Sequence, residues 1–111
     1  MDRLEAYKES VKRVISQYAG LKPSYGEVEA ELVFDDERGH YELLYTGWDG
    51  YRRIHGSVVH IDVRDGKVWI QHDGVEDGIA DELLAAGIPP EHIVLAFQHP
   101  HKRQYSGFAV R

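Results

Sequence analysis

The sequence predicts a single α+β domain over residues 1–111, in which a mostly antiparallel sheet of five or six strands carries a long N-terminal helix and a shorter second helix on one face. Three observations lead to this prediction. The chain opens with an amphipathic helical stripe, continues with alternating apolar runs, and joins the two clearest runs by an Asp-Gly pair. At 111 residues, the chain is long enough to bury about two-thirds of its unfolded surface around one core.

Residues 2–19 carry the helical stripe. Their apolar side chains recur at spacings of three and four, which places them on one side of an α-helix. Asp2 is a suitable N-cap residue for this helix. We expect the stripe to cover the apolar face of the sheet, and its members are Leu4, Tyr7, Val11, Val14, Ile15 and Tyr18.

Residues 52–72 form the centre of the predicted sheet, because two alternating runs meet at Asp65-Gly66. This dipeptide is a strong hairpin signal, since both turn residues need a positive φ and glycine reaches it without steric cost. One face of the hairpin is aliphatic and must be covered, whereas the other can meet water or a partner through His60, Asp62, Trp69 and Gln71. A two-residue loop predicts the cross-strand pairs Arg64 with Lys67, Val63 with Val68, Ile61 with Ile70, and Val59 with His72.

The remaining elements follow from the same kinds of pattern. Alternation predicts strands over 27–34 and 40–48, and Asp49-Gly50 predicts the turn after the second one. A continuous apolar run over 93–97 predicts a strand buried on both faces and parallel to a neighbour, because a helix precedes it. We also expect a helix over 79–86, a loop over 99–104 and a last short strand over 106–110.

Composition narrows the classes of function. A formal charge of −6 argues against non-specific binding to nucleic acid, and the region 27–42 alone carries seven acidic residues against one basic residue. This acidic patch is a solvated face or a docking site for a basic partner. The chain has no cysteine and no apolar run as long as a membrane span, so we expect a cytoplasmic protein that does not enter the membrane.

Seven histidines raise the question of a metal site. The strongest pair is His99-Pro100-His101, but zinc needs three or four converging ligands and the sequence specifies no third one. His60 and Asp62 point the same way from one strand, which suits a hydrogen-bonded pair or a general base; a partly exposed polar face explains them equally well.

The sequence contains no glycine-rich phosphate-binding loop, no Gly-x-Ser-x-Gly motif and no His-Glu-x-x-His motif. We therefore predict no catalytic residue, no metal and no cofactor.

Two short clusters combine aromatic and basic side chains. If the fold brings them together, they form a small positive surface suited to a protein hot spot or to a nucleic-acid backbone. The alternative is a pair of solvated loops with Trp48 anchored in the core. We predict partner binding by Trp48, Tyr51, Arg52 and Arg53 in the first cluster and by Lys102, Arg103 and Tyr105 in the second.

Several short motifs occur together along almost the whole chain. They are Gly47-Trp48-Asp49-Gly50, Arg53, the run from His60 to Gln71 (HIDVRDGKVWIQ), Gly87-Ile88-Pro89, Ile93-Val94-Leu95, Phe97, Lys102-Arg103 and Gly107-Phe108-Ala109-Val110. Together they resemble the XisI family, the excision-controlling factors of the fdxN element. The sequence departs from the family pattern at Val75, Ala96 and Gln98, where threonine, glycine and histidine are usual.

The resemblance implies a small α/β protein of cyanobacterial type, required alongside a recombinase and a companion factor, XisH, for programmed removal of a DNA element. It supplies no catalytic residues. We therefore predict a non-enzymatic accessory factor that binds protein partners and contacts DNA indirectly. One alternative is an antitoxin-like partner that neutralises a nuclease-like companion. A second is direct DNA binding through Arg52, Arg53, Lys102 and Arg103, and a third is a metal-dependent enzyme. Formation of a homo-oligomer is left open.

Overall fold

One five-stranded sheet organises the molecule, with its strands in the order β1-β2-β3-β4-β5. The structure, a computed structural model, describes residues 2–21 and 26–111. The first four strands are antiparallel and β5 is parallel to β4, so the predicted α+β class with a mostly antiparallel sheet is confirmed. The elements are α1 (Arg3–Ala19), β1 (Glu27–Asp35), β2 (His40–Asp49), β3 (Arg52–Arg64), β4 (Lys67–Asp73), α2 (Ala80–Ala85), a 3₁₀ turn (Pro90–His92), β5 (Ile93–Leu95) and α3 (Pro100–Arg103).

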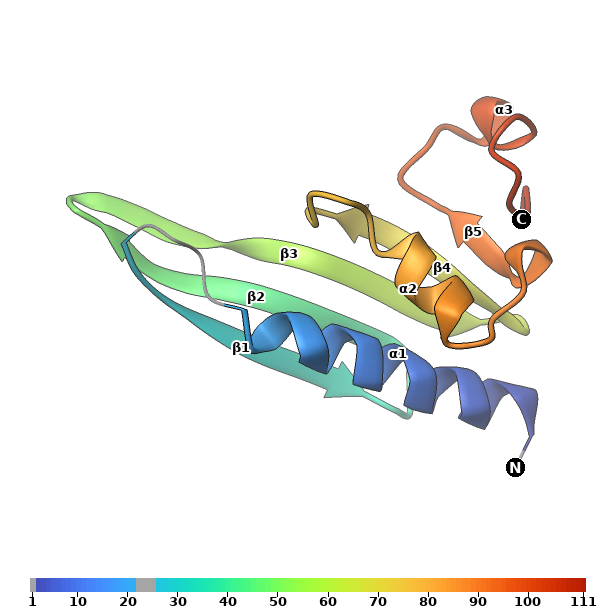
Figure 1. Cartoon of the computed structure of the whole chain (residues 1–111), viewed down its shortest axis with the longest axis horizontal. Coiled ribbons are helices and arrows are strands. Elements are labelled where there is room, and N and C mark those ends of the chain that lie inside the picture. The colour runs from blue at the N-terminus through green and yellow to red at the C-terminus, as the bar shows by residue number, and fades with distance from the viewer. Residues whose placement is uncertain (1, 22–25) are drawn as a thin grey trace.

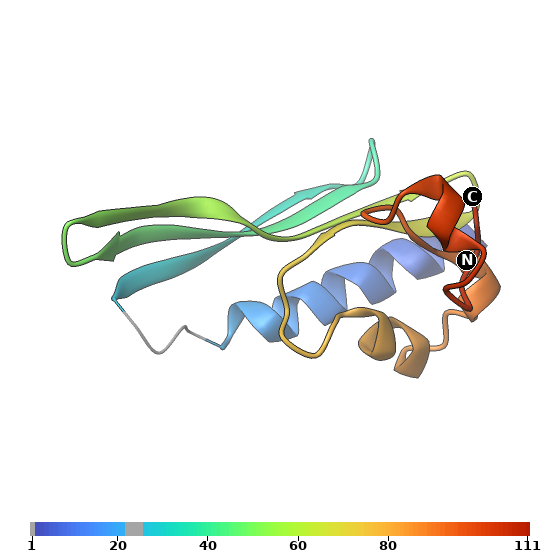
Figure 2. The same ribbon diagram turned by 90° about the horizontal axis from the view of Figure 1, so that it is seen from above.

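Within the described part of the chain, α1 and α2 both lie on one face of the sheet and no helix covers the other face (Figures 1 and 2). The second face is called the open face below.

The helix α1 begins where Asp2 accepts a hydrogen bond of 2.9 Å from the backbone N–H of Glu5, as its N-cap position predicts. No helix in 2–21 or 26–111 combines the length and the apolarity that a membrane span requires.

The hydrophobic core lies between α1 and the covered face of the sheet. Side chains from both sources are buried in it because the helical stripe and the strand alternation present their apolar sides to each other. From α1 these are Tyr7, Val11, Val14 and Ile15, and from the sheet Tyr41, Leu43, Val59, Ile61, Val63, Val68 and Ile70. The helix α2 and the segments around it complete the core with Ile79, Leu83, Ile88 and Ile93.

The central hairpin forms at Asp65-Gly66 as predicted, with φ angles of 53° and 77°. Three of the four predicted pairs are observed, namely Arg64 with Lys67, Val63 with Val68 and Ile61 with Ile70. The fourth is wrong: Val59 pairs with Asp73 because a bulge between His60 and Ile61 shifts the register by one residue. Val59 is nevertheless buried, so the bulge changes the pairing without changing which face is covered.

The C-terminal region differs from the expected strands. The strand β5 is parallel to β4 as predicted, but it ends at Leu95, because Gln98 closes a turn by donating its backbone N–H to the Leu95 carbonyl oxygen at 3.1 Å. The predicted loop over 99–104 contains the short helix α3. The predicted strand over 106–110 is reduced to one bridge between Val94 and Ala109.

Candidate functional site

The first predicted cluster lies at the tip of a long extension of the sheet. Residues 44–57, here called the arm, are the distal half of the β2–β3 hairpin, and they extend beyond the C-terminal end of α1 (Figure 1). The tip turn consists of Gly50 and Tyr51, one residue later than predicted, because Asp49 pairs with Arg52. Gly50 has a φ of 62° at the first turn position, which glycine adopts without strain.

The aromatic side chains of the arm tip are available to a partner. Trp48 is 51% exposed, which shows that the alternative of a core-anchored Trp48 is wrong, and Tyr51 is fully exposed. The guanidinium carbon of Arg53 lies 5.2 Å from the Trp48 ring centroid, a cation–π arrangement. Arg52 forms an ion pair of 3.2 Å with Asp49. These contacts hold two cations and the Trp48 ring beside the tip turn.

The second predicted cluster has a mixed role. Lys102 and Tyr105 line an open hollow of about 720 Å³ beside α3, which Phe97 also lines. Arg103, in contrast, is a structural residue. Its guanidinium donates hydrogen bonds to the carbonyl oxygens of Gln98 at 3.0 Å, Ala96 at 3.1 Å and Val110 at 3.4 Å, and so closes the C-terminal loop on itself.

The fold does not bring the two clusters together. The arm tip lies at one end of the long sheet, whereas α3 follows β5 at the other end (Figure 1). The strand β3 separates these ends with 13 residues, which at about 3.3 Å per residue span about 40 Å. A single composite surface therefore does not form, and the arm tip is a separate candidate site.

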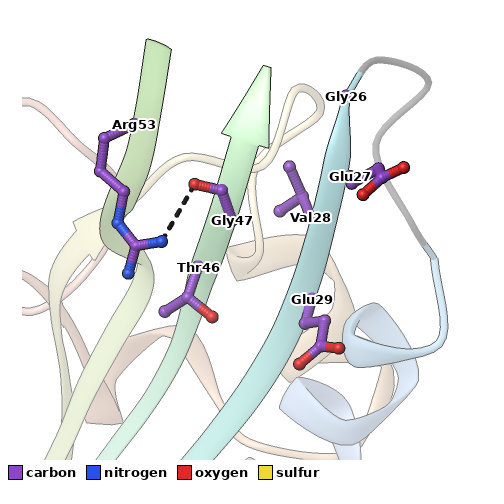
Figure 3. A pocket seen from close by; sticks show the side chains of 7 residues that line it. All are labelled: Gly26, Glu27, Val28, Glu29, Thr46, Gly47 and Arg53. Atoms are coloured by element: carbon purple, nitrogen blue, oxygen red, sulfur yellow. Dashed lines mark hydrogen bonds between the residues drawn. The ribbon is translucent and has the colours of Figure 1, made fainter. Parts of the chain in front are cut away.

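A shallow hollow of about 550 Å³ lies at the side of the arm (Figure 3). Glu27 and Glu29 of β1 and Arg53 of β3 line it, so its rim carries both signs of charge. Arg53 also donates to the carbonyl oxygen of Gly47 at 3.3 Å, which orients its guanidinium along the strands. The residues of this hollow supply charge and hydrogen-bonding groups suited to recognition.

A polar cluster lies on the open face where β2 begins and β3 nears its end. Asp62 is only 5% exposed, although we expected it to meet water or a partner. Its Oδ1 lies 2.6 Å from His40 Nδ1 and 2.9 Å from His60 Nε2, and its Oδ2 accepts a bond of 3.2 Å from the Gln71 amide. The predicted pairing of His60 with Asp62 is thus observed. Sequence reasoning missed His40, which joins them through its pairing with Asp62 across β2 and β3.

Comparisons with known proteins agree with the motifs. The family described as XisI protein matches residues 1–110. Among solved structures, the fdxN element excision controlling factor XisI from Anabaena variabilis ATCC 29413 is 36% identical with a TM-score of 0.85, covering 99% of this chain and 100% of that one. A XisI-like protein from the same organism is 42% identical with a TM-score of 0.90, covering 97% and 99%. A comparison with curated proteins finds no significant match. The chain therefore belongs to the XisI family.

Proposed function

We propose that this protein is a non-enzymatic regulatory factor in site-specific excision of a DNA element, and that it acts in the cytoplasm by binding a protein partner through its arm. The partner is a XisH-like companion. Support comes from family membership and from a relative, 36% identical, that is named an excision controlling factor. The observation that carries the proposal is the arm tip, where Trp48 and Tyr51 are exposed at the end of the β2–β3 hairpin.

The residue types at the arm tip are those that dominate binding energy in protein interfaces. Trp, Tyr and Arg are enriched in hot spots because each buries a large rigid surface and offers a polar group at its end. The stacking of Arg53 on Trp48 and the ion pair of Arg52 with Asp49 restrict these side chains before the partner arrives. Less conformational entropy is then lost on binding.

Charge around the arm favours a basic partner over DNA. Glu27 lies opposite Trp48 in the β1–β2 pairing, and Glu29 lines the neighbouring hollow. These carboxylates repel phosphates, whereas they attract a basic protein surface and speed its association. Direct DNA binding by both predicted clusters is disfavoured for a further reason, since Arg103 is bonded within its own loop.

The test is calorimetric titration of the purified protein with a purified XisH-like companion. We expect Trp48→Ala and Arg53→Ala to weaken binding at least tenfold, which corresponds to about 1.4 kcal/mol or more. Tyr105→Ala removes an exposed aromatic ring at the opposite end of the sheet and is the matched control, with unchanged affinity. Equal binding by all three variants would place the interface elsewhere, and no binding by the unsubstituted protein would contradict the companion as partner.

Three further measurements separate the alternative functions. Antitoxin-like neutralisation requires the companion's nuclease activity to fall as this protein is added. Direct DNA binding requires a complex with duplex DNA at low salt that weakens steeply as salt is raised. The proposed accessory role predicts neither result, and it predicts instead that recombinase output rises when both factors are present. If the protein binds the recombinase and not the companion, the companion is wrong as the partner and the recombinase takes its place.

A further inference from the structure

Three side chains with metal-binding atoms converge on the open face of the sheet. His40 Nδ1 and His60 Nε2 lie 2.6 Å and 2.9 Å from the same oxygen of Asp62. All three donor atoms lie within 4.8 Å of one another. Two imidazoles and one carboxylate therefore point at a common position, although they come from two different strands.

The sheet itself produces this convergence. His40 is directly opposite Asp62 in the β2–β3 pairing, which brings their Cβ atoms to about 5 Å. His60 lies two residues before Asp62 on the same strand, so both side chains leave β3 on the same face. The rigid backbone of two paired strands thus holds the three groups in place without a loop.

The carboxylate of Asp62 is held as a metal ligand usually is. Its side chain is 7% exposed, and its second oxygen accepts a hydrogen bond from the amide of Gln71, which fixes the plane of the carboxylate. Partners of this kind orient ligands and are an integral part of metal sites. His40 is about half-exposed, which gives an ion and its waters access from solvent.

We propose that His40, His60 and Asp62 bind one divalent transition-metal ion, with water completing its coordination. Imidazole nitrogen selects zinc, iron, nickel or copper over magnesium and calcium, which take oxygen ligands. With metal–ligand distances of about 2.0–2.2 Å in tetrahedral geometry, donor atoms lie about 3.3–3.6 Å apart. The separations of 2.6 Å and 2.9 Å from Asp62 Oδ1 would therefore open by about 0.4–1 Å when an ion enters. Rotation of the exposed His40 ring supplies part of that movement.

This site goes beyond the proposed docking role and does not depend on it. It lies where β2 begins and β3 nears its end, at the opposite end of the β2–β3 hairpin from the arm tip at Gly50 and Tyr51. A bound ion would cross-link the two strands and stabilise the folded protein, because the ligands converge only after the sheet has formed. Its open positions would present an electrophilic centre on the open face.

The test is titration of tag-free, EDTA-treated protein with Zn²⁺ by calorimetry and with Co²⁺ by visible absorption. We expect one equivalent to bind, the visible bands of coordinated Co²⁺ to appear, and Zn²⁺ to raise the Tm. His40→Ala should weaken binding at least tenfold, and Asp62→Asn should do the same. Because Asp62 is buried, circular dichroism of Asp62→Asn is needed, whereas His40 is exposed enough for its variant to fold normally.

Two controls make the result decisive. His55→Ala removes an exposed imidazole from the same strand, and the double variant His99→Ala, His101→Ala removes the His-x-His pair near α3. Both should bind Zn²⁺ like the unsubstituted protein. The proposal is overturned if the unsubstituted protein binds no stoichiometric metal, if His40→Ala binds as well as it does, or if only the double variant loses binding.

Discussion

The hydroxyl of Tyr41 donates a hydrogen bond of 2.8 Å to Oδ1 of Asp36, although the rest of Tyr41 is buried in the core. The other oxygen of Asp36 accepts a bond of 3.0 Å from the ammonium of Lys12 on α1. Burial and this hydrogen bond raise the pKa of Tyr41 well above its ordinary value. One carboxylate thus links the N-terminal helix, the β1–β2 turn and the core.

This linkage predicts a loss of stability in acid. The Lys12 ammonium and then the Tyr41 hydroxyl lower the pKa of Asp36 below its ordinary value of 3.8. The folded state therefore releases the proton more readily than the unfolded state does. The resulting stabilisation is complete above about pH 5 and is lost as the pH falls through the ordinary value and then the lowered pKa. Urea denaturation between pH 2.5 and 7 should show a smaller pH dependence for Asp36→Asn and for Lys12→Gln. An unchanged pH dependence in both variants would contradict the linkage.

Gly47 is required for the close approach of β1 and β2. A Cβ at this position would overlap the carbonyl oxygen of Glu27 and lie 2.8 Å from the Cα of Val28. We expect Gly47→Ala to lower the free energy of unfolding by about 1–3 kcal/mol, because the strands must separate to admit the methyl group. Gly56→Ala is the control, since no described atom lies within 4 Å of its added Cβ, and its effect should stay within about 0.5 kcal/mol. Chemical denaturation measures both, and equal stability of the two variants would contradict the argument.

The covered face of the sheet carries most of the stability. Ile61 is fully buried opposite Ile70, so Ile61→Ala should cost about 2–5 kcal/mol through lost burial and the cavity left behind. Leu32, on the edge strand β1, is 41% exposed, and Leu32→Ala should cost less than about 1 kcal/mol. Thermal and urea denaturation of the two variants give this comparison. A larger loss for Leu32→Ala would show that the core has been assigned to the wrong place.

Arg103 should be essential for the order of the C-terminal loop. Three carbonyl oxygens accept from its guanidinium, and a lysine cannot reach them with one ammonium group. Arg103→Lys should therefore increase amide hydrogen exchange across residues 96–110, with α1 unaffected. Lys102→Ala changes the neighbouring, exposed cation and should leave that exchange as it is. Equal protection in both variants would show that the bonds of Arg103 contribute little.

The elements that sequence analysis predicted well depend on local chemistry. The Asp65-Gly66 turn forms because two adjacent residues meet its φ requirements, and the three pairs nearest the turn follow by counting. The prediction of the fourth pair was wrong because a bulge shifts the register by one residue. A bulge of this kind cannot be recognised from the alternation of apolar and polar residues. The predicted strand over 106–110 is reduced to a bridge at Ala109, and the carbonyl oxygen of Val110 accepts from the Arg103 side chain, a contact that the alternation of residues does not predict.

The sequence by itself determined the class of the fold, the apolar faces of α1 and of the central hairpin, and membership of the XisI family, because periodicity, turn residues and motifs are properties of neighbouring positions. Only the tertiary structure decided that the two basic and aromatic clusters lie at opposite ends of the sheet and that His40 meets His60 and Asp62. The first outcome depends on the pairing of β5 with the start of β4, and the second on the register between β2 and β3. That register is set by packing across the whole sheet, including a shift between Leu43 and Leu44.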